Sequence, residues 1–475
     1  MLITIKFGGT SVGDAERIRS AAQLVASQVA QGRKVAVVTS AMSGVTNKLV
    51  ALLDEAKVTG TDDQQRITQY FRFAKSLEND HTETARRAIK DPQLFEQAAN
   101  ILYSERHALE RVLIGSHFLG ELTPIGYDFI VSQGERMCVP ILANCLKDLG
   151  VDAVGIGGEG CGIMTDSNYG NARPLEKETR TEVRRRLVPI LESGKVPVMG
   201  GFFGHSPQGR IAILGRGGSD YSATLVGCAL DAGEIWIMTD VDGIKTTDPR
   251  IVPAAHTVHE MPYLLAAEMS LLGAKVLHPK SVLPAAKQGV PVRVASSFEP
   301  EKPGTRLVPS LPDETPRVVA LTLVRHGTLI RLSSPELGSE PVVGADLNTD
   351  LRRQNVDFLA SASTANGGNA LWLIGPLETD RFLVLLEQHK DATVPSEIHR
   401  DVAVLAVIGE RVATATGIIA LLVRCLDEVG TQPLAILQGA SPNSVVVALP
   451  DDEKQLPTTL KILHTRFELD EETAF

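Results

Sequence analysis

The sequence predicts an α/β protein: a three-layer αβα sandwich with a mainly parallel sheet, followed by two small βαββ modules. Three observations support this prediction. Short β-branched runs alternate with helical stretches through the first 300 residues, a cluster of prolines follows, and a strand–helix–strand–strand pattern then occurs twice. Strands separated by helices need crossover connections, which produce a parallel sheet with helices on both faces. The length of 475 residues allows about three domains at roughly 150 residues each.

The elements of the first domain follow from hydrophobic periodicity. Residues 3–7 form a β-branched run, and a helix is expected over 14–31, capped by Asp14 and ended by Gly32. Residues 34–38 are apolar enough for a strand that is buried on both faces. The further strands, with helices between most of them, are expected at 151–156, 196–199, 211–214, 234–238 and 292–295.

The domain boundaries are predicted from a change in composition. Five prolines fall between residues 300 and 316, a density that a core strand or helix does not tolerate. The predicted divisions are a first domain over 1–298, a proline-rich linker over 299–317, and two modules over 318–398 and 399–475. Within the modules, strands are expected at 327–332, 356–359, 402–408, 432–437 and 445–449, with a helix at 415–429.

Charge and composition exclude several classes of protein. The net charge of −10 does not steer a chain toward nucleic acid or anionic lipid, so we expect neither as a partner. No run approaches the ~18 apolar residues of a membrane span. The chain enters its first strand without an export leader, and its five cysteines form no CxxC pair. We therefore expect a cytoplasmic protein with no metal site of its own.

Two familiar motifs are matched only in part. Residues 155–160 fit GxGxxG after a predicted strand, but a glycine-containing loop follows instead of the helix that a dinucleotide site needs. No GxxxxGK[ST] string is present, which excludes a P-loop.

Two predicted strand-to-helix junctions combine glycine with charge. Lys6 precedes Gly8 and Gly9, whose backbone N–H groups could approach phosphate oxygens while the ammonium neutralises them. Arg216 stands among three glycines shortly before Asp220, at another strand end. A tight turn and a surface ion pair are the ordinary structural alternatives, although an ion pair alone has no need for three glycines.

Two further segments are weak signals by themselves and become candidates for the same site only together with these junctions. Glu135 lies in the first turn of a predicted helix, where a carboxylate also stabilises the helix dipole. The polar stretch 239–250 follows a strand, as the rim of a nucleotide site would, or simply as a loop.

Taken in order, these strings resemble the aspartokinase family. The matching strings are KFGGTSV at 6–12, SAMSGVTN at 40–47, SQGE at 132–135, LGRGGSD at 214–220, TDVDGIKTTDPR at 239–250 and GAKVLHP at 273–279. The resemblance covers the first 300 residues and continues more weakly through the tail. It implies an amino-acid kinase fold followed by two ferredoxin-like ACT modules.

The resemblance implies transfer of the γ-phosphoryl group of MgATP to the side-chain carboxylate of L-aspartate, giving 4-phospho-L-aspartate. This is the first step toward lysine, threonine and methionine. Lys6 and Asp220 would be the catalytic residues, and the cofactors would be ATP and Mg²⁺. The implied aspartate contacts are Ser40, Thr46, Glu135 and Arg216. The implied nucleotide contacts are Lys6, Phe7, Gly8, Gly9, Thr239, Asp240, Lys245, Arg250, Lys275 and Val276, with Lys245 where the family has a tyrosine.

The tail suggests regulation, since the first 300 residues could complete this chemistry alone. In the family, ACT modules pair between subunits and bind an amino-acid end product, so a homodimer or larger oligomer inhibited by lysine or threonine is implied. Residues 333–346 do not show the usual effector-loop pattern, and Asp357 is a candidate for the effector's ammonium. Two alternatives stay open: another kinase of this fold, acting on glutamate or acetylglutamate, and an inactive amino-acid sensor.

Overall fold

The computed structural model describes residues 1–56, 63–158, 160–274, 277–311, 315–333, 343–354, 356–364, 369–388, 396–439 and 441–470. The chain divides into two compact units. Unit 1 comprises Met1–Ile244, His259–Tyr263 and Leu277–Pro309. Unit 2 comprises Lys245–Val258, Leu264–Val276 and Ser310–Phe475.

Unit 1 is built on an eight-stranded sheet whose order is β3-β4-β2-β1-β7-β9-β10-β8. All neighbouring pairs are parallel except β9 with β10, so the predicted mainly parallel sheet is confirmed. Its strands are β1 (Leu2–Phe7), β2 (Lys34–Thr39), β3 (Ala153–Ile156), β4 (Val196–Gly200), β7 (Glu234–Thr239), β8 (Glu260–Pro262), β9 (Val292–Ser296) and β10 (Thr305–Val308).

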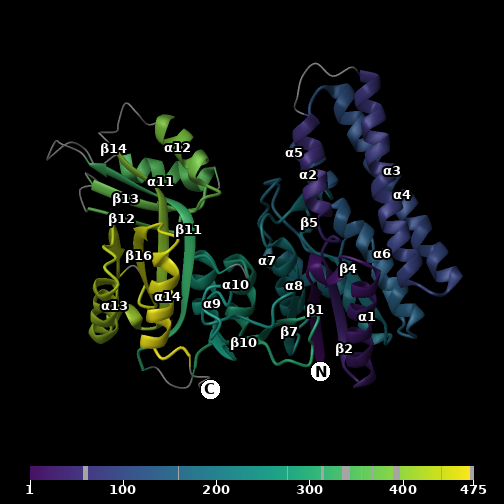
Figure 1. The fold of residues 1–475 in the computed structure, drawn as a ribbon. Coiled ribbons are helices and arrows are strands. Elements are labelled where there is room, and N and C mark those ends of the chain that lie inside the picture. The colour runs from purple at the N-terminus through teal and green to yellow at the C-terminus, as the bar shows by residue number, and fades with distance from the viewer. Residues whose placement is uncertain are drawn as a thin grey trace. The chain divides into compact units, whose positions relative to one another are not determined.

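Helices cover both faces of this sheet, which gives the predicted three layers (Figure 1). On one face α1 and α6 pack together, and the long antiparallel helices α3 and α4 lie against them; on the other face α8 covers β1, with α7 and α10 beside it. The helices are η1 (Gly9–Val12), α1 (Ala15–Ala30), α2 (Val45–Ala56), α3 (Asp63–Ala88), α4 (Pro92–Leu119), α5 (Pro124–Val131), α6 (Gln133–Asp148), α7 (Glu176–Glu192), α8 (Gly218–Ala229) and α10 (Pro279–Gln288).

The alternation of β1 decides which way its functional lysine points. Ile3, Ile5 and Phe7 are buried in the core shared with α1 and α6, because successive side chains of a strand face opposite sides of the sheet. Thr4 faces α8, where a Cβ on Gly227 would lie 3.3 Å from its hydroxyl. Lys6 shares that face, and it therefore points toward the layer that contains α8.

Helix α1 begins and ends as its sequence predicts. The side chain of Asp14 accepts a hydrogen bond from the backbone N–H of Arg17 at 2.9 Å, which satisfies one of the free amides of the first turn. Gly32 has a φ of +77° directly after the helix, a conformation that favours glycine.

Two expectations about unit 1 were wrong. The proline-rich segment 299–317 contains β10, which pairs with both β9 and β8, because the prolines flank this strand without entering it. The strand predicted at 211–214 exists as β6 (Ile211–Ile213), but it lies outside the main sheet. It forms a two-stranded antiparallel pair with β5 (Phe203–His205).

Unit 2 contains the two predicted βαββ modules, each followed by one more helix. The first has β11 (Arg317–Ser333), α11 (Val343–Arg353), β12 (Ala360–Ser363), β13 (Asn369–Ile374) and α12 (Thr379–Gln388). The second has β14 (Ser396–Glu410), η3 (Val412–Thr414), α13 (Thr416–Glu428), β15 (Ala435–Leu437), β16 (Ser444–Pro450) and α14 (Gln455–Arg466).

The two modules share one six-stranded sheet, ordered β12-β13-β11-β14-β16-β15. The long strands β11 and β14 pair antiparallel at its centre. The predicted boundary between residues 398 and 399 consequently falls inside β14. The strand predicted at 356–359 begins later, at Ala360, and β13 was not predicted.

Two earlier segments of the chain pack against this sheet as part of unit 2. In the segment 245–258, the carbonyl of Thr246 accepts a hydrogen bond from the backbone of Leu321 at 2.7 Å, and Val252 is buried in the core of the second module. Helix α9 (Tyr263–Leu271) precedes Leu272, whose carbonyl accepts a 2.7 Å hydrogen bond from Thr322.

Across the described ranges, none of the helices is long and apolar enough to cross a membrane.

Candidate active site

Lys6 and Asp220 form the centre of the site in unit 1. The Lys6 ammonium lies 2.5 Å from Oδ1 of Asp220, and Lys6 is only 7% exposed. Lys6 lies near the carboxyl end of β1, where the sheet continues to β2 on one side and to β7 on the other. Open α/β sheets bind ligands at such a switch point. Asp220 comes from the first turn of α8, so the pair joins a strand end to a helix N-terminus.

The glycine turn after β1 passes directly beside this ion pair. A Cβ on Gly8 would lie 3.6 Å from the Lys6 ammonium nitrogen, and one on Gly9 would lie 3.1 Å from the carbonyl of Ala41. The N–H of Gly8 donates to the carbonyl of Met238 at 3.0 Å. The expectation that this N–H faces a phosphate is therefore wrong: Gly8 serves close approach, and Gly9 remains the candidate donor.

Glu135 is a buried carboxylate in the first turn of α6 and is 3% exposed. Burial raises the pKa of its carboxyl to about 8, although the N–H group of Ala41 and the charge of Lys6 lower it. Its Oε2 has no hydrogen-bond partner among the described residues. A buried, unpaired carboxylate needs a cation or a proton, so this position suits the ammonium of an amino acid.

The other predicted aspartate contacts lie on a loop, a helix and a turn that follow strand ends. The backbone N–H of Ser40 donates to the carbonyl of Phe7 at 3.0 Å, which fixes the loop after β2 to the end of β1. Thr46 is half-buried in the first turn of α2. Arg216 is exposed on the turn before α8, and among the described residues it has no hydrogen bond or ion pair, as a residue reserved for a ligand would.

The predicted nucleotide residues fall into three groups. Thr239 ends β7, and its hydroxyl donates to the Asp240 carboxylate at 3.1 Å, at the same sheet edge as Lys6. Lys245 and Arg250 belong to unit 2, where Lys245 donates to Thr257 at 2.9 Å and Arg250 pairs with Asp248 at 2.7 Å. Lys275 and Val276 lie outside the described residues.

A cavity of about 580 Å³ opens on the outer side of the glycine turn. It is lined by Ser11, by polar residues of α1 such as Arg17, and by Phe298. Lys6 and Asp220 do not line it. The charge of Lys6 and Asp220 and their place at the strand ends therefore locate the site.

Comparison with known proteins assigns the family. The model of the amino acid kinase family matches residues 1–296. Lysine-sensitive aspartokinase 3 of Escherichia coli is 32% identical over 462 residues, covering 96% of this chain and 97% of that protein. The aspartate kinase of Pseudomonas fluorescens is 30% identical over 480 residues, covering 99% and 98%. This chain belongs to the aspartokinases.

A solved structure agrees with this assignment over the whole chain. Escherichia coli aspartokinase III in complex with aspartate and ADP superposes with a TM-score of 0.79 at 29% identity, covering 98% of this chain and 99% of that one. The same enzyme in complex with lysine and aspartate gives a TM-score of 0.80 at 28% identity, with the same coverage. The resemblance inferred from the strings is thereby confirmed, as are the fold class and the ATP-dependent kinase activity that they implied.

Sequence reasoning missed one wall of this aspartokinase site, residues Gly200–Phe202, where β4 ends. A Cβ on Gly200 would lie 3.2 Å from Cβ of Glu135, and one on Gly201 would lie 2.9 Å from Cα of Ser219. Phe202 has a φ of +73°, an uncommon conformation for a bulky residue. The signal was present in the sequence: two glycines directly after a buried strand, as at positions 8 and 9.

Proposed function

We propose that this aspartokinase transfers the γ-phosphoryl group of ATP to the side-chain carboxylate of L-aspartate. A carboxylate oxygen attacks the γ-phosphorus, the bond from that phosphorus to the β-phosphate oxygen breaks, and the products are 4-phospho-L-aspartate and ADP. No general base is needed, because a carboxyl group of pKa about 3.9 is ionised at neutral pH. The observation that carries the proposal is the Lys6–Asp220 pair beside the buried carboxylate of Glu135.

The catalytic roles follow from this geometry. The Lys6 ammonium stabilises negative charge on the transferred phosphoryl group, as preorganised cations do in phosphoryl transfer. Asp220 holds that ammonium in place through the 2.5 Å ion pair. The N–H group of Gly9 adds a donor at the turn.

Aspartate carries two carboxylates and one ammonium, so the protein must offer a partner to each of these three groups. Glu135 pairs with the ammonium, and the buried position strengthens that pairing. Arg216 binds a carboxylate through two N–H groups, a geometry that lysine cannot reproduce. Ser40 and Thr46 add hydroxyl contacts.

The nucleotide enters as its Mg²⁺ complex, so the ion arrives with the substrate. Mg²⁺ in kinases is held largely by substrate phosphates and water. The described residues contain no group of three or more histidine, cysteine or acidic side chains that could hold a metal by themselves. The nucleotide contacts that we propose among the described residues are Lys6, Phe7, Gly9, Thr239, Asp240, Lys245 and Arg250, while Gly8 lets the backbone turn close to Lys6.

The experiment that tests the activity is hydroxamate formation from ATP in the presence of hydroxylamine, which traps an acyl phosphate. Aspartate should give hydroxamate, whereas glutamate and acetylglutamate should give little. A preference for glutamate or acetylglutamate would assign the chain to another reaction of the same fold. Absence of product with all three would favour the amino-acid sensor.

We further propose that residues 318–398 and 399–475 form paired regulatory modules in a homodimer or larger oligomer. Three exposed apolar side chains support this: Ile398 on β14, Val423 on α13 and Ile436 on β15. Lysine is the first effector to test, since one relative is named lysine-sensitive and its structure was solved with lysine; threonine is the second. Asp357 is exposed and stays a candidate effector contact, while residues 334–342 lie outside the described part of the chain. Inhibition assays with lysine and with threonine test the regulation, and sedimentation tests the oligomeric state.

We also place this enzyme in the cytoplasm. Its five cysteines are all buried and free of disulfides, which is the usual state of cysteines in a reducing compartment.

A further inference from the structure

A second buried ion pair lies directly behind the aspartate site, between α6 and α4. Nη2 of Arg136 is 2.7 Å from Oε2 of Glu105, and the two side chains are only 10% and 12% exposed. The guanidinium carbon of Arg136 lies 4.7 Å from the ring centre of Phe129. A Cβ on Gly158 would lie 3.0 Å from Nη2 of Arg136, so the backbone at Gly158 passes close to the guanidinium.

Gln133 completes this cluster. In the amide orientation that satisfies both of its groups, Gln133 donates to Oε2 of Glu105 at 3.2 Å and accepts from Nη1 of Arg136 at 3.1 Å. Positions three apart lie on one side of a helix, so residues 133 and 136 of α6 both face α4.

The residues between them face the substrate side. Gly134 packs against the loop after β2, where its Cβ would meet that of Ala41 at 2.5 Å. Glu135 lies near Lys6, whose charge acts on its carboxyl. One turn of helix thus presents a carboxylate to the substrate while its other side is anchored to α4.

This anchoring matters because the first turn of α6 has no side-chain cap of its own. Ser132 occupies the N-cap position, but its side chain makes no capping hydrogen bond; its hydroxyl donates instead to the carbonyl of Phe129 at 2.8 Å. Without a side-chain cap, the orientation of a first turn depends on its tertiary contacts.

We infer that Arg136, clamped by Glu105 and Gln133, is a positioning residue that fixes the first turn of α6 and thereby aims Glu135 at the ammonium of aspartate. The inference rests on the proposed function, since it concerns the same substrate. It predicts a selective effect, because a shift of Glu135 weakens aspartate binding and leaves the nucleotide side of the site intact.

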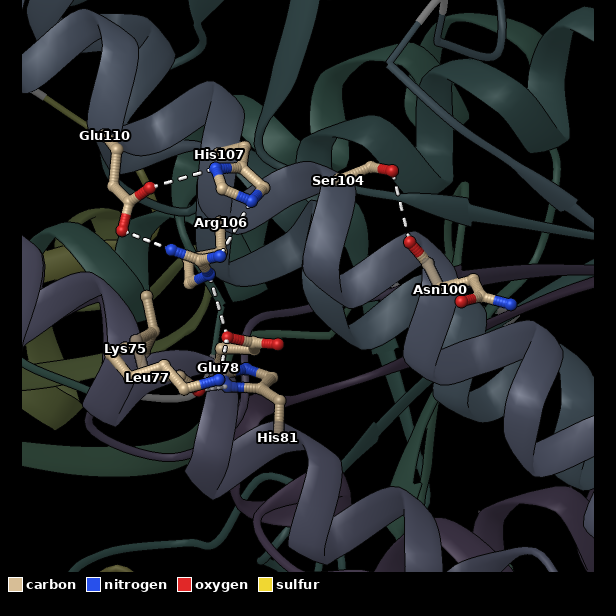
Figure 2. A network of polar contacts seen from close by, with 9 residues as sticks. All are labelled: Lys75, Leu77, Glu78, His81, Asn100, Ser104, Arg106, His107 and Glu110. Carbon is tan, nitrogen blue, oxygen red and sulfur yellow. Dashed lines mark hydrogen bonds and ion pairs between the residues drawn. The ribbon is translucent and has the colours of Figure 1, made fainter.

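The next residue of α4 offers a matched control. Arg106 forms an equally buried cluster with Glu78 of α3, at 2.8 Å, and with Glu110, at 2.5 Å (Figure 2). The side chains of Arg106 and Glu78 are 12% and 10% exposed, almost the same as those of the Arg136–Glu105 pair. The cluster ties α4 to α3 through side chains of these two helices, so its loss should affect stability and not aspartate binding.

The experiment compares Glu105→Gln and Arg136→Lys with Glu78→Gln in the full-length enzyme. The first two should raise KM for aspartate about tenfold while KM for ATP stays within about twofold. Glu78→Gln should lower the melting temperature about as much as Glu105→Gln does. It should leave the KM values for aspartate and for ATP within about twofold of those of the unmodified enzyme. Isothermal titration of aspartate measures the same selectivity without turnover.

Two outcomes would overturn the inference: an unchanged KM for aspartate in Glu105→Gln, or an equal rise in Glu78→Gln. If Glu105→Gln does not fold, Arg136→Lys decides by the same criterion, because it keeps the charge and loses only the planar, two-pronged contact. The proposed function fails separately, when the unmodified enzyme does not phosphorylate aspartate at all.

Discussion

Lys6 and Asp220 form an ion pair where charge develops on the transferred phosphoryl group, so their contribution should appear mainly in kcat. Lys6→Ala and Asp220→Ala should each remove at least ~2 kcal/mol of transition-state stabilisation, a loss of about thirtyfold. Steady-state hydroxamate kinetics measure this. Lys48→Ala is the control, since Lys48 forms only an exposed pair with Asp80, a kind of contact worth little. Normal kcat in both site variants would remove the pair from the mechanism.

Glu135 makes aspartate binding depend on pH. With a pKa of about 8 against an ordinary 4.5, its carboxyl is protonated in the free enzyme at neutral pH. Between these values the folded chain binds more protons than the unfolded chain, so the stability of the free enzyme falls as pH rises through this window. The aspartate ammonium favours the ionised form, so binding releases a proton and tightens as the pH approaches about 8.

The measurement for Glu135 is KM for aspartate from about pH 6 to about pH 8.5, together with calorimetry in two buffers of different ionisation enthalpy. KM should fall with rising pH, and proton release should appear as a buffer-dependent heat. Glu135→Gln should bind aspartate weakly and without this pH dependence. A pH-independent KM and no proton release in the unmodified enzyme would contradict the assignment.

The candidate site residues Lys6, Asp220 and Glu135 share one signal in the sequence. Each combines charge with glycine at an element boundary, a pattern that packing alone does not require. The structure pairs Lys6 with Asp220 and buries Glu135 where the Lys6 charge acts on it. Two details needed coordinates. The N–H of Gly8 is used by Met238, and the proximity of Gly200 to Glu135 joins segments far apart in sequence.

At the scale of elements, the turn after β4 is a spacer for α8. Gly201 has an ordinary φ, yet its added Cβ would lie 2.9 Å from Cα of Ser219 and 3.0 Å from Val38. Gly201→Ala should therefore push the first turn of α8, which carries Asp220, and lower kcat along with about 1–3 kcal/mol of stability. Gly157→Ala is the control, because its Cβ would meet nothing within 4 Å. Equal activity of the two variants would show that the turn is not a spacer.

Two elements that sequence reasoning missed or shortened, β10 and β14, share a physical cause. Periodicity identifies strands by their apolar faces, and so it found β1, β2, β4, β7 and β9. It missed β10 because flanking prolines outweighed the short run from Thr305 to Val308. It shortened β14 because His399 and Arg400 are polar, although both are paired in register with β11. Pairing between distant strands overrode local preference in both cases.

At the scale of the whole molecule, the compact units do not follow the predicted domain boundary. The sequence predicts a first domain that runs without interruption from residue 1 to residue 298. The segments 245–258 and 264–276, which carry Lys245 and Arg250 and lead into the GAKVLHP string, instead belong to the compact unit of the C-terminal modules. The sequence does not reveal that these segments belong to unit 2, because both precede the proline cluster that predicts the domain boundary.

One contact that ties the first of these segments to the rest of unit 2 is a chain of three side chains, of which Thr246 and His464 are buried and Asp470 is exposed. The hydroxyl of Thr246 is 2.9 Å from Nε2 of His464, and Nδ1 of the same ring is 2.6 Å from Asp470. His464 is fully buried at the end of α14. Thr246 directly follows Lys245, so the position of this nucleotide candidate depends on a histidine near the C-terminus.

His464→Ala should therefore weaken ATP selectively. A lost buried hydrogen bond costs about 1 kcal/mol, so KM for ATP should rise about fivefold while KM for aspartate changes little. His464→Gln should restore much of the loss, because its amide can reach the position of Nε2. Arg466→Ala is the control, since Arg466 lies two residues further along the same helix and pairs only with Glu428 at the surface. Equal rises in both KM values, or no rescue by Gln, would mean that His464 supports general stability and does not hold the nucleotide segment.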